Sequence, residues 1–200
     1  KQTAETLAPV GSFAYFSESY IAFGDGKICA KALDDRIGCM LMIELLQSEL
    51  EADTWFCFQV QEEVGLRGAA CTGSRVQPDR VLVLEATTAA DLDGVTGDKR
   101  VCVVGDGPVV SFMDGATIYD RALYRMARET ADENGIPSQT KTAIAGGNDA
   151  GALQRAGQGS AALAVSLPCR YIHSGASVVQ QSDIDATRAL LAALLPKLYD

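Results

Sequence analysis

The chain contains 200 residues, enough for one domain or at most two small ones. Hydrophobic residues form 48% of the sequence and charged residues 22%, a globular composition that excludes a disordered chain. The 26 acidic residues outnumber the 17 basic ones and give a net charge of −9, which repels phosphate backbones. Nucleic acid is therefore not an expected partner, whereas divalent cations would be attracted.

The sequence is typical of a cytoplasmic protein that does not enter a membrane. Its longest apolar runs, such as residues 190–195, are too short to cross a bilayer, and residues 1–5 lack a signal-peptide pattern. Six cysteines lie mostly in apolar segments and form no CxxC pair, which favours reduced, buried thiols.

The first 26 residues contain strand and turn patterns only. Residues 13–16 and 20–23 are predicted as short strands, and a glycine-rich turn at 24–26 leads into a third strand at 27–33. Because this opening differs from the rest of the chain, we expect it to be a separate β element.

From residue 27 onward, strand and helix patterns alternate. Strands are predicted at 54–60, 80–84, 101–104, 142–144 and 161–166, and helices at 36–50, 69–73, 119–134, 148–155 and 183–198. Ser182 or Asp183 is predicted to cap the last of these helices. This alternation predicts an α/β domain over residues 27–200, with a mostly parallel or mixed sheet sandwiched by helices.

Acidic residues and the only histidine follow the ends of the predicted strands. They are Asp34, Glu62, Glu63, Glu85 and His173. In open α/β sheets, ligands bind beyond the carboxyl ends of the strands. Carboxylates gathered there repel one another unless they bind protons or cations, and with an imidazole they suit zinc, cobalt or manganese. Each residue alone has an ordinary explanation as a helix cap, a solvated loop residue or a structural histidine, so this pattern leaves both interpretations open.

Five motifs occur in order along the chain. They are KALDDRIG (31–38), QEEVGLRGA (61–69), LEATT (84–88), GGNDAG (146–151) and PCRYIHS (168–174). Together they resemble the glutamyl/tetrahedral aminopeptidase family of co-catalytic metallopeptidases, some members of which carry the name endoglucanase. The resemblance covers nearly the whole chain and implies a zinc-peptidase-like fold and the metal-dependent removal of N-terminal residues from peptides.

The resemblance also implies roles for individual residues. In the family two divalent ions share one aspartate, which corresponds to Asp34, and a cis peptide bond is expected between Asp34 and Asp35. Glu63 and His173 match the other ligands of the second ion, and Glu85 stands where the family places a carboxylate ligand of the first. Glu62 matches the general base, which takes a proton from water and later delivers one to the leaving amine. Two zinc or cobalt ions are thus expected in the complete enzyme, and one of them in this chain.

The resemblance further implies a substrate-side loop and an assembly. Gly147, Asn148 and Asp149 match the loop that lines the substrate, and Arg170 could bind a substrate carboxylate or neutralise the acidic crevice. Family members form large homo-oligomers, so the complete protein is expected to be a homo-oligomer that acts on peptides.

The chain departs from the family pattern at its N-terminal side. It lacks the His-x-Asp motif that supplies a ligand of the first ion, since His173 is its only histidine. Residues 1–26 are expected to be the remnant of an inserted β subdomain, with residues 27–200 as the C-terminal part of the catalytic domain. A non-enzymatic metal-binding or assembly module is therefore an alternative. A glycosidase is disfavoured, because a metal-bound Glu63 cannot serve as one of its paired acids.

Overall fold

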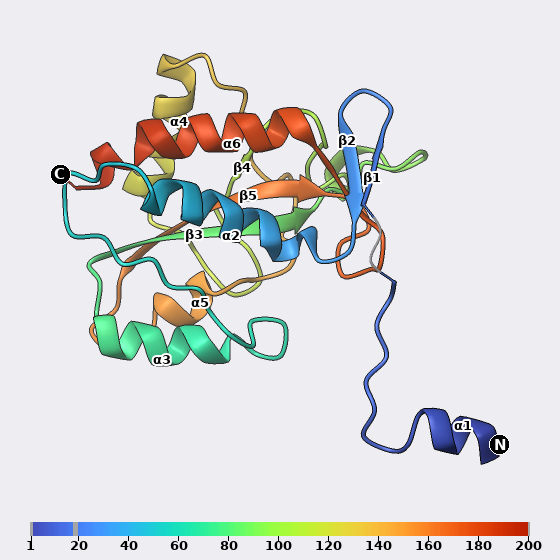
Figure 1. Cartoon of the computed structure of the whole chain (residues 1–200). Coiled ribbons are helices and arrows are strands. Elements are labelled where there is room, and N and C mark those ends of the chain that lie inside the picture. The colour runs from blue at the N-terminus through green and yellow to red at the C-terminus, as the bar shows by residue number, and fades with distance from the viewer. Residues whose placement is uncertain (1, 18–19, 200) are drawn as a thin grey trace.

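The computed structural model describes residues 2–17 and 20–199 (Figure 1). Two long parallel strands, β3 (Arg80–Thr88) and β5 (Ala161–Cys169), lie at its centre. The short strand β4 (Val109–Val110) pairs antiparallel with β5, so the sheet order is β3-β5-β4. Every residue of β5 after the first is buried, which explains its continuous apolar sequence.

A second, antiparallel sheet stands beside the carboxyl ends of β3 and β5. It has the order β1-β2-β6 and contains β1 (Tyr20–Phe23), β2 (Lys27–Ala30) and β6 (Ser177–Gln180). The predicted turn between β1 and β2 is confirmed, with Gly24 and Gly26 at positive φ. The boundary between a β subdomain and a catalytic domain at residue 26 stays a prediction.

Helices cover both faces of the central sheet, as the sequence predicts (Figure 1). One face carries α2 (Leu33–Leu46), α4 (Arg121–Glu133) and α6 (Gln181–Leu194), and the other carries α3 (Arg67–Val76) and α5 (Ala150–Leu153). Buried apolar clusters on each side join these helices to β3 and β5. The short 3₁₀ helices η1 (Gly97–Lys99) and η2 (Pro196–Leu198) complete the list.

Four predicted strands are wrong. Residues 13–16, 54–60, 101–104 and 142–144 do not form strands. The 101–104 segment is buried as expected, but the Val103 N–H donates to the Gln139 side chain and the Val104 N–H to the Asp91 carboxylate. The apolar run therefore predicted burial correctly. The two N–H groups, however, donate to side-chain oxygens and not to the backbone of a neighbouring strand.

The other three segments lack partners for a ladder. Residues 54–60 are extended, yet Trp55 is 74% exposed and no strand pairs with them among the described residues. Residues 13–16 are extended and exposed, and a helix that the sequence did not predict, α1 (Gln2–Leu7), precedes them. The 142–144 segment makes a backbone bond from the Thr142 N–H to the Val101 carbonyl but forms no ladder.

The ends of several helices differ from prediction. Helix α2 stops at Leu46, four residues early, and α6 begins at Gln181. Asp183 does not cap α6, because its buried carboxylate accepts hydrogen bonds from the Gly105 and Gly107 N–H groups, both at 2.8 Å. Within the part of the chain that the structure describes, no helix is long and apolar enough to span a membrane.

Candidate metal centre

The chain changes direction at the junction of β2 and α2, and this bend presents two carboxylates. Ala32 has a positive φ of 54°, Asp34 and Asp35 have non-helical backbone angles, and a cis peptide bond joins the two aspartates as expected. Asp35 Oδ1 accepts a hydrogen bond from the Gly38 N–H at 3.0 Å, which is the contact an N-cap makes. Gly38 is required there, since a Cβ would lie 2.1 Å from Asp35 Oδ2.

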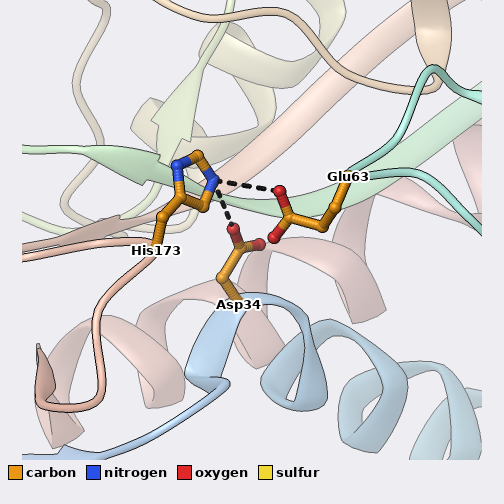
Figure 2. Close-up of side chains that lie close together, drawn as sticks. All are labelled: Asp34, Glu63 and His173. Atoms are coloured by element: carbon orange, nitrogen blue, oxygen red, sulfur yellow. Dashed lines mark ion pairs between the residues drawn. The ribbon is translucent and has the colours of Figure 1, made fainter. Parts of the chain in front are cut away.

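Three of the predicted ligands converge at this bend (Figure 2). His173 Nε2 lies 3.3 Å from Asp34 Oδ2 and 3.4 Å from Glu63 Oε2. The three residues come from the start of α2, the loop before α3 and the loop between β5 and β6, so only the folded chain brings them together. The Asp34 side chain is 12% exposed, while those of Glu63 and His173 are about 60% exposed, which leaves one side of the cluster open to solvent.

A second group of carboxylates shares Asp34. Single ligand atoms of Asp34, Asp35 and Glu85 lie within 4.8 Å of one another, as do those of Asp34, Glu63 and His173. Asp34 therefore stands between two potential cation positions, which is the bridging place that the resemblance implies. The sequence did not single out Asp35 for this group, and its position directly after Asp34 was the available signal.

The donor set fits a divalent metal ion. Ligand atoms about 2.0–2.2 Å from one zinc ion lie at most about 4.4 Å apart, and both His173 contacts are shorter than that. Carboxylate oxygens with one imidazole nitrogen are also the ligand types that zinc and cobalt accept.

Without bound cations, the pKa values of several carboxyl groups in and beside this centre are raised. Burial, followed by repulsion from Asp35 and Asp34, raises the pKa of Glu85 to about 10. Burial also raises the pKa of Asp35 to about 8. For Glu62, burial comes first and repulsion from Asp149 and Glu63 follows, raising its pKa to about 7. Bound cations would relieve this repulsion.

We expect the metal-free chain to lose stability as pH rises. Unfolded carboxyl groups titrate near 3.8 and 4.5, whereas folded Glu62, Asp35 and Glu85 keep their protons to about pH 7, 8 and 10. The unfolded state therefore binds fewer protons between these limits, and the free energy of unfolding falls with rising pH. Urea unfolding in chelator at about pH 5.5 and about pH 8.5 measures this. Glu85→Gln should flatten the dependence, and a stability that rises with pH would contradict it.

The loop at residues 146–149 is held firmly beside this centre. The Gly115 N–H donates to the Gly146 carbonyl at 2.8 Å, and Gly147 packs so closely on Ala116 that a Cβ would lie 2.8 Å away. The buried Asn148 amide donates to the Tyr119 hydroxyl at 3.1 Å. The next residue, Asp149, is 6% exposed and lines the same cavity as Glu62 and Glu85. The structure thus brings the predicted substrate-side loop to the carboxylates.

Arg170 is engaged in an ion pair. Its Nε and one terminal nitrogen donate to both carboxylate oxygens of Asp91, at 2.6 and 2.7 Å. Burial raises the pKa of Asp91, but hydrogen bonds from Arg170 and the Val104 N–H outweigh it and lower the pKa. This geometry favours the alternative that Arg170 neutralises a carboxylate rather than binding substrate. Sequence reasoning missed Asp91, which lies 79 positions from its partner.

Comparison with known families bears directly on this centre. Residues 1–190 match the model of the M42 glutamyl aminopeptidases. The chain belongs to the M42 glutamyl aminopeptidase family. Its members are peptidases and therefore hydrolases, which confirms the resemblance carried by the five motifs.

Relatives of this M42 chain are about twice as long. It is 32% identical over 191 residues to the putative aminopeptidase FrvX of Escherichia coli K12, covering 94% of this chain and 54% of FrvX. It superposes on aminopeptidase APDkam598 of the archaeon Desulfurococcus kamchatkensis with a TM-score of 0.90 at 31% identity, covering 98% of this chain and 56% of that one. The TET1 peptidase of Pyrococcus horikoshii can assemble into a tetrahedron or a large octahedral shell. The chain superposes on it with a TM-score of 0.80 at 31% identity, covering 97% of this chain and 57% of that one. The M42 chain thus has the mixed α/β fold of these aminopeptidases.

Proposed function

We propose that this M42 chain carries the metal-binding and proton-transferring part of an aminopeptidase that removes N-terminal residues from peptides. The observation that carries the proposal is the convergence of Asp34, Glu63 and His173. His173 Nε2 lies within 3.4 Å of a carboxylate oxygen of each of the other two, and one side of the cluster is open to solvent. Family membership supports the reaction class, and the position of Glu62 next to Glu63 supplies a free acid beside the ligands.

Asp34, Glu63 and His173 would hold one divalent ion, zinc or cobalt. Asp34 and Glu85 would contribute to a second, and Asp35 lies close enough to join them. When bound, such ions acidify a water molecule, polarise the scissile carbonyl and anchor the free amine of the substrate.

Glu62 would serve as the general base. Its carboxyl is partly buried beside the ligands, and without cations burial and repulsion from Asp149 and Glu63 raise its pKa to about 7. Bound cations would relieve part of this repulsion and favour the carboxylate form that accepts a proton. Glu62 would take a proton from the attacking water and then deliver that proton to the leaving amine. Glu63 would remain tied to the ion, so adjacent glutamates would have different roles.

The surroundings suit a substrate with a positively charged end. Among the residues that the structure describes, none hydrogen-bonds to the buried Oδ1 of Asp149, which lines the same cavity as Glu62. Close packing of Gly147 and a hydrogen bond of Asn148 hold the adjoining loop in place. A free α-amine would be attracted by these acidic side chains. The complete protein would act on peptides as a homo-oligomer in the cytoplasm, as the assembly of the TET1 relative and the reduced cysteines suggest.

The test is metal stoichiometry together with peptide hydrolysis. After incubation with excess zinc or cobalt and removal of free ion, elemental mass spectrometry should find at least one ion per chain. Two ions with hydrolysis of aminoacyl substrates would support a working centre in this chain alone. One ion without hydrolysis would favour the non-enzymatic metal-binding alternative for these 200 residues. No bound ion would contradict the proposal.

A further inference from the structure

The central sheet places a serine directly beside the candidate ligand Glu85. β3 and β5 run side by side in parallel, and Glu85 and Ser166 are partners in their register (Figure 1). Neighbouring strands lie about 4.8 Å apart, so partners whose side chains leave the same face of the sheet are within reach of each other.

Both side chains leave the face of the sheet that carries α3 and α5. Val83 of β3 and Ala164 of β5 belong to the apolar cluster that joins the sheet to these two helices. Side chains alternate between the two faces along a strand. Glu85 and Ser166 each lie two positions further along their strands, and they therefore share this face.

The hydroxyl group of Ser166 is buried without a partner. The residue is 1% exposed, and its Oγ makes no hydrogen bond within residues 2–17 and 20–199. Its other neighbours on this face of the sheet are apolar, with Val109 opposite it on β4 and Ala164 and Pro168 two positions away on β5. Buried hydroxyl groups are almost always hydrogen-bonded, and Glu85 is the polar residue that stands beside this one in the sheet.

Glu85 has more conformational freedom to lose than the aspartates of its ligand group. One of its carboxylate oxygens lies within 4.8 Å of ligand atoms of Asp34 and Asp35. Asp35 is already oriented by the Gly38 N–H, which donates to its Oδ1 at 3.0 Å. The longer glutamate side chain has one more rotatable bond, so a donor that orients its carboxylate would favour ligand binding. Carboxylates that bind metal ions are commonly held by such hydrogen bonds.

We propose that Ser166 is a positioning residue for Glu85. The Ser166 hydroxyl donates a hydrogen bond to one oxygen of the Glu85 carboxylate and leaves the other oxygen for a divalent ion. Ser166 touches neither the ion nor the substrate and acts only through Glu85. The inference rests on the proposed function, because that function makes Glu85 a metal ligand.

Zinc affinity and stability together test the inference on the 200-residue chain. Competition with a chromophoric chelator gives the zinc dissociation constants, and Glu85→Gln identifies the binding step that depends on Glu85. Ser166→Ala should weaken that step at least about tenfold, because loss of a group that orients a ligand costs 10–100-fold in affinity. In excess chelator, Ser166→Ala should unfold at the same urea concentration as the parent or at a higher one, since it removes a buried hydroxyl that has no partner.

Ser111→Ala is the matched control. Ser111 is also fully buried, and its Oγ has no hydrogen-bond partner in the described part of the chain. It stands opposite Ala164 and not opposite Glu85, because its N–H donates to the Ala164 carbonyl at 3.0 Å. The Ser111→Ala variant should therefore bind zinc as the parent does.

The possible results separate this inference from the proposed function. If Glu85→Gln weakens zinc binding and Ser166→Ala does not, only the inference is overturned. It is also overturned if Ser111→Ala weakens zinc binding as much as Ser166→Ala, or if Ser166→Ala unfolds at a lower urea concentration in chelator, which would make the hydroxyl a structural group. If Glu85→Gln leaves zinc binding unchanged, the ligand role of Glu85 is wrong and the inference falls with it.

Discussion

Replacing Glu62 by glutamine is expected to lower the rate of peptide hydrolysis at least about 100-fold in the complete enzyme, with its metal content unchanged. Glutamine keeps the size of the side chain but cannot take a proton from water at neutral pH. The loss should appear in kcat, because the loop at 146–149, which we propose to line the substrate, is untouched. Initial rates on aminoacyl chromogenic substrates and elemental analysis of the same sample measure both quantities.

The neighbouring residue provides the matched control. Glu63→Gln makes the same chemical change one position along, where the carboxylate lies 3.4 Å from His173 Nε2. This variant should lose bound metal, whereas Glu62→Gln should not. Unchanged turnover in Glu62→Gln would remove the general-base assignment, and loss of metal in that variant would make Glu62 a ligand instead.

Replacing His173 by alanine is expected to weaken zinc binding to the 200-residue chain at least about 100-fold. Loss of a residue that merely orients a ligand typically costs 10–100-fold in affinity, and His173 supplies the only nitrogen of its group. Competition with a chromophoric chelator at fixed pH gives the dissociation constants of both proteins.

Tyr171→Ala is the control for that measurement. Tyr171 lies in the same loop, is 57% exposed and belongs to neither ligand group, so its variant should bind zinc as the parent does. Equal affinity of His173→Ala and the parent chain would make His173 a structural residue and leave the carboxylates alone as candidate ligands.

The sequence predicted the site better than it predicted the strands. Asp34, Glu63, Glu85 and His173 could be selected because each follows a predicted strand, and parallel strands deliver their ends to one edge of the sheet. The structure bears this argument out only in part, because residues 54–60 form no strand, β2 belongs to the antiparallel sheet and Glu85 lies inside β3. The ordered motifs do not depend on strand ends, and they selected the same residues. The structure confirms the α/β sandwich and brings these residues together.

The errors concern interactions that no local pattern encodes. The 54–60 segment has the composition of a buried strand, but a strand also needs a neighbour, and composition does not say whether one is present. The hydrogen bonds that Gly105 donates to Asp183 and that Arg170 donates to Asp91 join residues almost 80 positions apart. Their side chains looked like a helix cap and a substrate ligand because only their immediate neighbours in sequence could be considered.

The Arg170–Asp91 pair has a consequence for the loop that carries His173. Arg170 also exchanges two backbone hydrogen bonds with Val178, both at 2.9 Å, so the loop at residues 171–177 is closed at its base. Asp91 also accepts two hydrogen bonds from the guanidinium of the same residue, which stabilises this closed base. The conformational entropy of the loop is therefore lost when the protein folds and not when a ligand arrives. As the metal ligand that we propose, His173 would thus belong to a preorganised receptor, whose affinity is not reduced by the cost of ordering its own loop.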